Sequence, residues 1–234
     1  MKSTALAILM ASATTIPLAL PAEAEDNPWM VRGRVLAVLP DESASLSVGG
    51  DTLPGDVDIG DQYVPELDIT YFFNDNLAAE LILAVTPHDV DATGITIPAA
   101  ELEDATVGLG DVWLLPPTLT LQYHFRNDTA FKPYIGAGVN ATHFFNEDEG
   151  DVADSVDYDA SFGFALQAGV DYDLDGVPGG WAFNADVKKV WINTEADVDL
   201  TSALGGALGA EEVIVNADVD IDPVIVGLGF GYKF

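Results

Sequence analysis

Residues 158–173 alternate between two kinds of side chain, and this pattern constrains the fold more than any other feature of the chain. Apolar and aromatic side chains dominate the even positions, from Phe162 to Tyr172, and small or polar ones dominate the odd positions, from Ser161 to Asp171. Successive side chains of a β-strand point to opposite faces. The alternation therefore predicts a strand with one apolar face, and residues 223–234 repeat it with glycines on the other face.

Stretches of this kind recur, and the lengths of the segments between them alternate. We expect eight strands, at residues 29–39, 62–73, 77–86, 112–125, 131–145, 158–173, 181–194 and 223–234. Short turns fall at 74–76, 126–130 and 174–180, whereas the connections at 40–61, 87–111, 146–157 and 195–222 are long. Short turns at one end and long loops at the other are typical of outer-membrane barrels. The sequence predicts an all-β fold, an eight-stranded antiparallel transmembrane β-barrel with long acidic extracellular loops.

The positions of the aromatic residues bear on which face meets lipid. Trp181 and Trp191 lie on one face, ten residues apart. At a rise of ~3.3 Å per residue and a tilt of ~40°, they span about 25 Å, the height of a lipid-facing band between aromatic girdles. A soluble β-sandwich or a lipocalin-like barrel is the alternative, and it would turn the apolar face inward. The small, polar face suits the narrow lumen of a membrane barrel.

Acidic residues are concentrated in the long connections. The chain has 39 acidic and eight basic residues, a net charge of −31, yet 49% of its residues are hydrophobic. The four long segments hold 26 of the 39 acidic residues and no Lys or Arg. We therefore expect one acidic face, exposed to water and lipopolysaccharide. Such a surface repels phosphate, which argues against a nucleic-acid partner.

The N-terminal residues have the features of a secretory signal peptide. Lys2 precedes a short apolar run at 5–20, and Ala22-Glu23-Ala24 follows as a cleavage site. This order predicts a signal peptide at 1–24 and a barrel domain at 25–234. An uncleaved membrane helix is the alternative, but the run is short for one. We expect export to the outer membrane of a Gram-negative cell, without disulfides because the chain has no Cys.

The C-terminal strand ends in Tyr232 and Phe234, with Gly229 behind them. An aromatic C-terminal residue of this kind resembles the signal that the barrel assembly machinery reads. The C-terminal residues therefore predict that the barrel assembly machinery is a partner of this protein.

Four strings resemble the outer-membrane protein W (OmpW) family. They are LPPTLTLQY at 115–123, KPYIGAGVN at 132–140, QAGVDY at 167–172 and DVKKVW at 186–191. The resemblance covers the strands and not the acidic loops. It implies an eight-stranded barrel with a narrow, largely apolar lumen that passes small hydrophobic molecules. In that family an inward apolar pair narrows the channel; Ile82 matches one member, and Lys188 stands in place of the other.

The strand phases predict which residues point into the lumen. The periplasmic half is expected to hold a charged network of Arg32, Arg34, Asp68, Glu80, Asp186 and Lys188. The extracellular half is expected to hold an apolar pocket of Leu36, Val38, Ile82, Leu114, Phe144, Val190 and Ile192. Buried charges must pair, so the network is either a structural plug or an ion path. The apolar residues are either core packing or a ligand pocket.

Pro116 and Pro117 interrupt a predicted strand, and proline has no N–H to give to a ladder. We expect a lateral gap there. The favoured function is passive uptake of small hydrophobic molecules with release sideways into the bilayer. There are two rival hypotheses. One is a structural or adhesive barrel with a plugged lumen, and the other is a small ion channel.

Nothing in the sequence predicts an enzyme. The three histidines lie on different segments, and neither a catalytic nucleophile nor a phosphate-binding loop is recognisable. We expect no cofactor, no metal site and a monomeric barrel.

Overall fold

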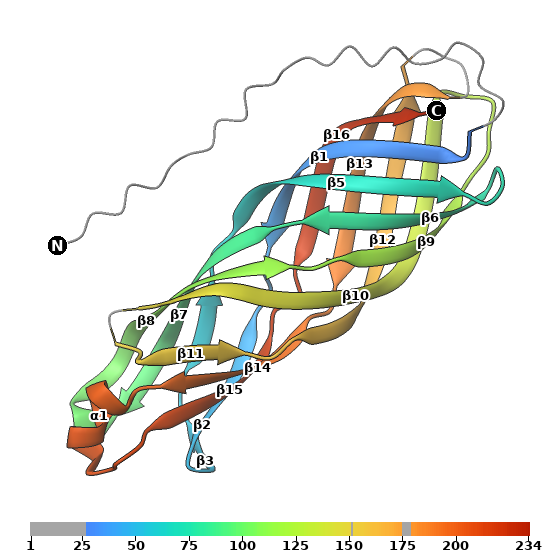
Figure 1. The fold of residues 1–234 in the computed structure, drawn as a ribbon. Helices are drawn as coiled ribbons and strands as arrows, with labels where there is room; N and C mark the ends of the chain where they lie inside the picture. The colour runs from blue at the N-terminus through green and yellow to red at the C-terminus, as the bar shows by residue number, and fades with distance from the viewer. Residues whose placement is uncertain (1–26, 151, 175–178) are drawn as a thin grey trace.

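The computed structural model describes residues 27–150, 152–174 and 179–234, so the predicted signal peptide lies outside the described residues. Eight antiparallel strands form a closed barrel, which confirms the predicted fold class (Figure 1). They are β1 (Trp29–Leu39), β5 (Gln62–Phe72), β6 (Leu77–Ala84), β9 (Thr118–His124), β10 (Phe131–Glu149), β12 (Ser161–Asp173), β13 (Gly180–Val190) and β16 (Val224–Lys233). The ladder between β10 and β12 closes the circle.

The β5–β6 and β9–β10 turns lie together at one end of the barrel (Figure 1), and β12 and β13 meet at the same end, where the Leu174 N–H donates to the Trp181 carbonyl at 2.9 Å. In the β5–β6 turn, the Asn74 side-chain oxygen accepts from the backbone N–H groups of Asn76, at 2.9 Å, and Leu77, at 3.0 Å. Asn favours turns for this reason, because its side chain satisfies nearby backbone donors. The C-terminus returns to the same end, where the Phe234 N–H donates to the Trp29 carbonyl at 3.0 Å.

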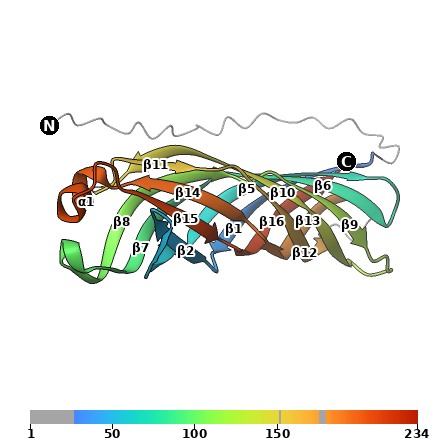
Figure 2. The same cartoon turned by 90° about the horizontal axis from the view of Figure 1, so that it is seen from below.

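The acidic connections extend the barrel wall at the end opposite the short turns, as Figure 2 shows from another side. These segments were expected to be long loops, but most of their residues form strands that continue the barrel wall. They are β2 (Ser43–Val48), β3 (Asp51–Leu53), β4 (Asp56–Ile59), β7 (Thr86–Ile97), β8 (Leu102–Leu115), β11 (Ser155–Tyr158), β14 (Asn193–Asp199) and β15 (Ile214–Asp220). The 3-10 helix η1 (Pro98–Ala100) and the helix α1 (Thr201–Leu208) complete this part. Within the described ranges no helix is long and apolar enough to cross a membrane.

The eight-stranded barrel is called the membrane part below, and its continuation by the acidic segments is called the extracellular part. The apolar and polar faces of the wall exchange places between these two parts. On β13, Val187 points outward and is exposed, whereas Lys188 points inward and is buried. On β14 the same phase continues, but the apolar Ala196 is buried and Asp197 is exposed. Hydrocarbon surrounds the first part and water the second, so each part turns a compatible face outward. This inversion explains how a chain can be both rich in acidic residues and apolar on average.

Aromatic pairs mark both edges of the membrane part. At the turn end, Trp29 packs edge-on against Tyr71 with ring centroids 4.8 Å apart, and Trp181 against Tyr232 at 5.3 Å. At the other edge the outward-facing Trp113 lies on the membrane-proximal end of β8. Trp181 is 54% exposed and Trp191 is partly exposed, both on the outer face as expected. These belts place the membrane part between the short turns and the base of β8.

Replacing Leu166 by Arg tests the lipid-facing assignment. Leu166 points outward from β12, is 52% exposed and lies between the two aromatic edges. The variant should lose roughly 2–4 kcal/mol of folding free energy in lipid vesicles, because a charge near the bilayer midplane is poorly solvated. Asp157→Arg on β11 is the matched control and should cost nothing, since its side chain meets water and faces Asp197 across the ladder. Equal effects of the two substitutions would contradict the assignment.

Candidate functional site

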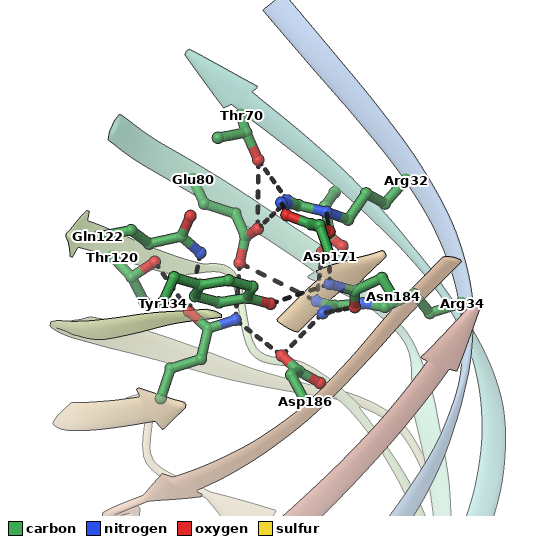
Figure 3. Close-up of polar contacts among 12 residues, drawn as sticks. Arg32, Arg34, Thr70, Glu80, Thr120, Gln122, Tyr134, Asp171, Asn184 and Asp186 are labelled. Carbon is green, nitrogen blue, oxygen red and sulfur yellow. Dashed lines mark hydrogen bonds and ion pairs between the residues drawn. The ribbon is translucent and has the colours of Figure 1, made fainter. Parts of the chain in front are cut away.

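Arg32 lies at the centre of a charged network inside the membrane part (Figure 3). Its guanidinium forms a two-pronged ion pair with Asp171, with Nε at 3.1 Å from Oδ1 and Nη2 at 2.7 Å from Oδ2. Nη1 lies 2.6 Å from Glu80 Oε2 and 2.7 Å from Thr70 Oγ1. The planar fork of arginine suits this paired recognition of carboxylates.

Arg34, two residues along the same face of β1, pairs with a second set of carboxylates. It lies 2.8 Å from Asp68 and 2.7 Å from Asp186, and it also contacts Glu66. Lys188 from β13 completes the set at 3.2 Å from Glu66 and 3.2 Å from Asp186. The structure therefore brings together all six residues of the predicted charged network.

Neutral polar side chains link these ion pairs across the lumen. The Gln167 amide donates to Glu80 at 3.0 Å and to Asp186 at 2.7 Å, and its oxygen accepts from Gln122 at 3.0 Å. Charged side chains from β1, β5, β6, β12 and β13 thus meet in one place, and all are buried. An eight-stranded barrel is just wide enough for side chains to fill it. We call this network the charged plug.

Glycines on β16 make room for the plug. A Cβ on Gly231 would lie 2.7 Å from Arg32 Cγ, and one on Gly227 would lie 2.5 Å from an Asp186 oxygen. The glycine face that is visible in the sequence therefore accommodates the arginine side chains and their partners.

Several members of the plug were not among the residues predicted from the sequence. Glu66 and Asn184 each lie two residues from a predicted member, on the same strand face, so strand phase alone could have found them. Tyr134 is 1% exposed and its hydroxyl accepts from the Asn184 amide at 3.1 Å. Tyr134 shares its strand phase with Phe144, which was predicted to point inward, so the same phase argument could have found it.

An apolar cavity of about 340 Å³ lies beyond the plug, inside the extracellular part. Its walls are mainly aliphatic side chains from β4, β7, β8, β14 and β15, together with Phe144, which stacks on Tyr158 at a centroid distance of 5.3 Å. Among the described residues, no Asp, Glu, Lys or Arg lines it. A cavity of this size and lining falls in the range of small-molecule sites.

Only part of the predicted apolar pocket lines this cavity. Leu114 and Phe144 do. Val190 and Ile192 pack in the surrounding core, Leu36 and Val38 form a separate cluster with Val64, and Ile82 is buried outside both groups. Most of the lining comes instead from the acidic segments. The alternation of acidic with apolar residues, as in Asp56-Val57-Asp58-Ile59, is the signal that could have identified it.

The predicted lateral gap coincides with an interruption of one ladder. The pairs between β6 and β9 end at Ile82–Thr118, and those between β7 and β8 begin at Thr86–Leu114. Both ladders share one register, which would place Ala84 opposite Pro116, but no pair forms there.

The two prolines face different neighbours. The Pro117 carbonyl accepts from the Ala141 N–H of β10 at 3.1 Å, so this side of the wall stays bonded. The Pro116 carbonyl instead accepts from the side chains of Asn140 and Thr118, each at 3.1 Å. Pro116 therefore occupies the position where an N–H would face β6.

The C-terminal aromatic residues lie at the turn end of the barrel. The Tyr232 and Phe234 rings pack edge-on with centroids 5.1 Å apart, and Tyr232 also contacts Trp181. Their recognition by the assembly machinery stays a prediction.

Comparisons with known proteins identify relatives along the whole barrel. The model of the OmpW family matches residues 26–234. The uncharacterized outer-membrane protein y4mB of Sinorhizobium fredii is 42% identical over 211 residues, which cover 89% of this chain and 80% of that protein. The dibenzothiophene metabolism operon protein PahQ of Pseudomonas aeruginosa is 30% identical, with 93% of each chain covered. The crystal structure of OprG from Pseudomonas aeruginosa is similar with a TM-score of 0.76 and 33% identity, over 88% of this chain and 95% of that one.

Replacing Arg34 by Ala tests whether the plug supports the fold. The change leaves Glu66, Asp68 and Asp186 with less positive charge beside them. Breaking a buried pair in this way should cost about 3–5 kcal/mol of folding free energy, measured by urea unfolding in lipid vesicles. Arg126→Ala, which breaks the exposed pair with Asp75, is the control and should cost about 0–1 kcal/mol. Similar small losses for both variants would show that the plug does not stabilise the barrel.

Proposed function

The chain belongs to the OmpW family of outer-membrane barrels, and on that premise we propose that it is a passive channel for small hydrophobic molecules. The observation that carries this proposal is the position of an apolar cavity directly beyond a charged plug. Together they favour uptake from outside and oppose passage along the barrel axis.

The cavity supplies the driving force for uptake. An apolar solute that leaves water for this site gains about 25 cal/mol per Å² of apolar surface buried. The lining offers no charged side chain among the described residues, so the solute displaces no ion pair on arrival. Phe144 and Tyr158 add flat aromatic surface to the aliphatic walls.

The plug makes the axial route unfavourable. Arg32 and Arg34 are fully buried and each is held by two or more carboxylates. An apolar solute that passed between them would separate these charges without solvating them, at a cost of several kcal/mol. The plug also disfavours the rival hypothesis of an ion channel, because an ion would also have to break the network.

The interrupted ladder supports a sideways route. Leu114, the last paired residue above the interruption, also lines the cavity. No backbone hydrogen bond pairs Ala84 with Pro116 in the described structure, so the wall can part there without breaking its ladder. We propose that solutes leave the cavity through this gap into the bilayer.

The name of one relative supports an apolar substrate. PahQ is described as a protein of an operon for the metabolism of dibenzothiophene, an apolar aromatic compound. The rival hypothesis, a structural or adhesive barrel that acts through its acidic surface, needs neither the cavity nor the gap. Experiments on these two features therefore separate the hypotheses.

Filling the cavity should block uptake. Ala196 lines the cavity from β14, and Ala196→Phe places a large side chain within it. Uptake of an apolar compound such as naphthalene into proteoliposomes should fall severalfold, while heat-dependent gel mobility shows a normally folded barrel. Glu195→Gln, the outward-facing neighbour, should leave uptake unchanged. If Ala196→Phe transports as the wild type does, the cavity is not on the route.

The proline pair provides a second test with a matched control. Pro116→Val supplies an N–H toward Ala84 and should close the ladder, which lowers apolar uptake. Pro117→Val supplies an N–H toward β10 and should leave the gap, and thus uptake, unaltered. Equal uptake by both variants and the wild type would remove the lateral route and favour the structural barrel.

A further inference from the structure

One imidazole ring lies among the mainly apolar side chains that line the cavity. His88 lies on β7, points inward and is 4% exposed. Its ring lines the cavity beside Ile59, Val90 and Val112. Nδ1 lies 3.1 Å from the backbone carbonyl oxygen of Gly60.

This contact determines which ring nitrogen carries the proton. A carbonyl oxygen only accepts hydrogen bonds, so Nδ1 donates its N–H to Gly60. In a neutral ring Nε2 then carries a lone pair, and it has no hydrogen-bond partner among the described residues. Burial lowers the pKa of His88 below its ordinary value of 6.5, although the Gly60 contact and the charge of Asp89 act in the other direction. The ring is therefore neutral at pH 7.

The other polar groups on the lining are less suited to receive a donor. Thr194 Oγ1 donates to the Asp159 carbonyl at 2.7 Å. Tyr158 remains a protonated phenol, because burial and the charge of Glu147 raise its pKa to about 12. The outer surface around the cavity is acidic and lacks Lys and Arg in all four segments. Anionic ligands are therefore repelled before they reach the cavity.

We propose that the cavity selects neutral, largely apolar molecules with one hydrogen-bond donor, a hydroxyl or an N–H group, which donates to Nε2 of His88. This inference rests on the proposed function and names its substrate class. Moving a hydrogen-bond donor from water into an apolar site costs free energy unless the donor finds a hydrogen-bond acceptor there. His88 provides that acceptor, whereas a hydrocarbon of the same shape gains nothing from it. The net gain of one hydrogen bond corresponds to about a three- to tenfold preference.

Matched probes measure this preference in the intact barrel. Dissociation constants of 1-naphthol, which has a donor, and 1-methoxynaphthalene, which has none, are determined at pH 7 for the protein in lipid nanodiscs. Partitioning of each probe into lipid is the same for every variant and cancels when preferences are compared. The preference for 1-naphthol should be about three- to tenfold higher in the wild type than in His88→Phe. Val90→Ala should weaken the binding of both probes by the same factor, and Tyr158→Phe should leave the preference for 1-naphthol unchanged.

Nitrogen-15 NMR of the wild-type protein gives a second measurement that needs no substitution at His88. The chain has three histidines, so the ring signals can be assigned. The His88 Nε2 resonance should shift when 1-naphthol is added and stay in place with 1-methoxynaphthalene. Equal preferences in the wild type and His88→Phe, an unmoved Nε2 signal, or a preference lost only in Tyr158→Phe would each overturn the inference while apolar binding stands. Failure of both probes to bind the wild type would instead overturn the proposed function.

Discussion

Backbone hydrogen bonding in hydrocarbon is the constraint on which this structure depends. Lipid offers no partner to an exposed N–H or C=O group, so a membrane sheet must close on itself. Here β12 pairs with both β10 and β13, and the circle is complete. Against that requirement the interruption opposite Pro116 is conspicuous, since the pairs on its two sides, Leu77–Ile82 with β9 and Thr86–Val90 with β8, share one register. The side chains of Asn140 and Thr118 satisfy the Pro116 carbonyl, so the gap leaves that group partnered.

The surrounding medium also determines the contents of the barrel. Where lipid lies outside, apolar side chains occupy the outer face, and the small or polar inner face can hold Arg32 and Arg34 with their carboxylates. Where water lies outside, the acidic residues turn outward and the same strand phase encloses an apolar cavity. Plug and cavity are therefore two results of one inversion. Their order along the axis, with the gap between β6 and β9 near the boundary, favours a solute path that turns sideways.

Strand phase made most of the membrane part predictable, because each phase is fixed by lipid on one side. The strands 62–73 and 77–86 are found at Gln62–Phe72 and Leu77–Ala84, and the six charged residues that the phases turned inward lie together. The acidic segments were misjudged because their charge suggested solvated loops. In these segments the inward-facing side chains are apolar and the outward-facing ones acidic, the reverse of the membrane part. Most of the cavity lining was therefore not predicted. Contacts between distant strands, such as the Tyr134 hydroxyl with Asn184, depend on barrel closure and left no local signal.

A reversible lock across the gap would test the lateral route most directly. The register places Leu83 opposite Pro117, and the chain contains no Cys, so Leu83→Cys with Pro117→Cys introduces one disulfide that bridges β6 and β9. Uptake of naphthalene into proteoliposomes would be measured with this pair oxidised and then reduced, beside each single-Cys variant. Oxidation should block uptake and reduction should restore it, both only in the double variant. Uptake that is the same in the oxidised and reduced states, with the disulfide shown to be formed, would contradict the lateral route.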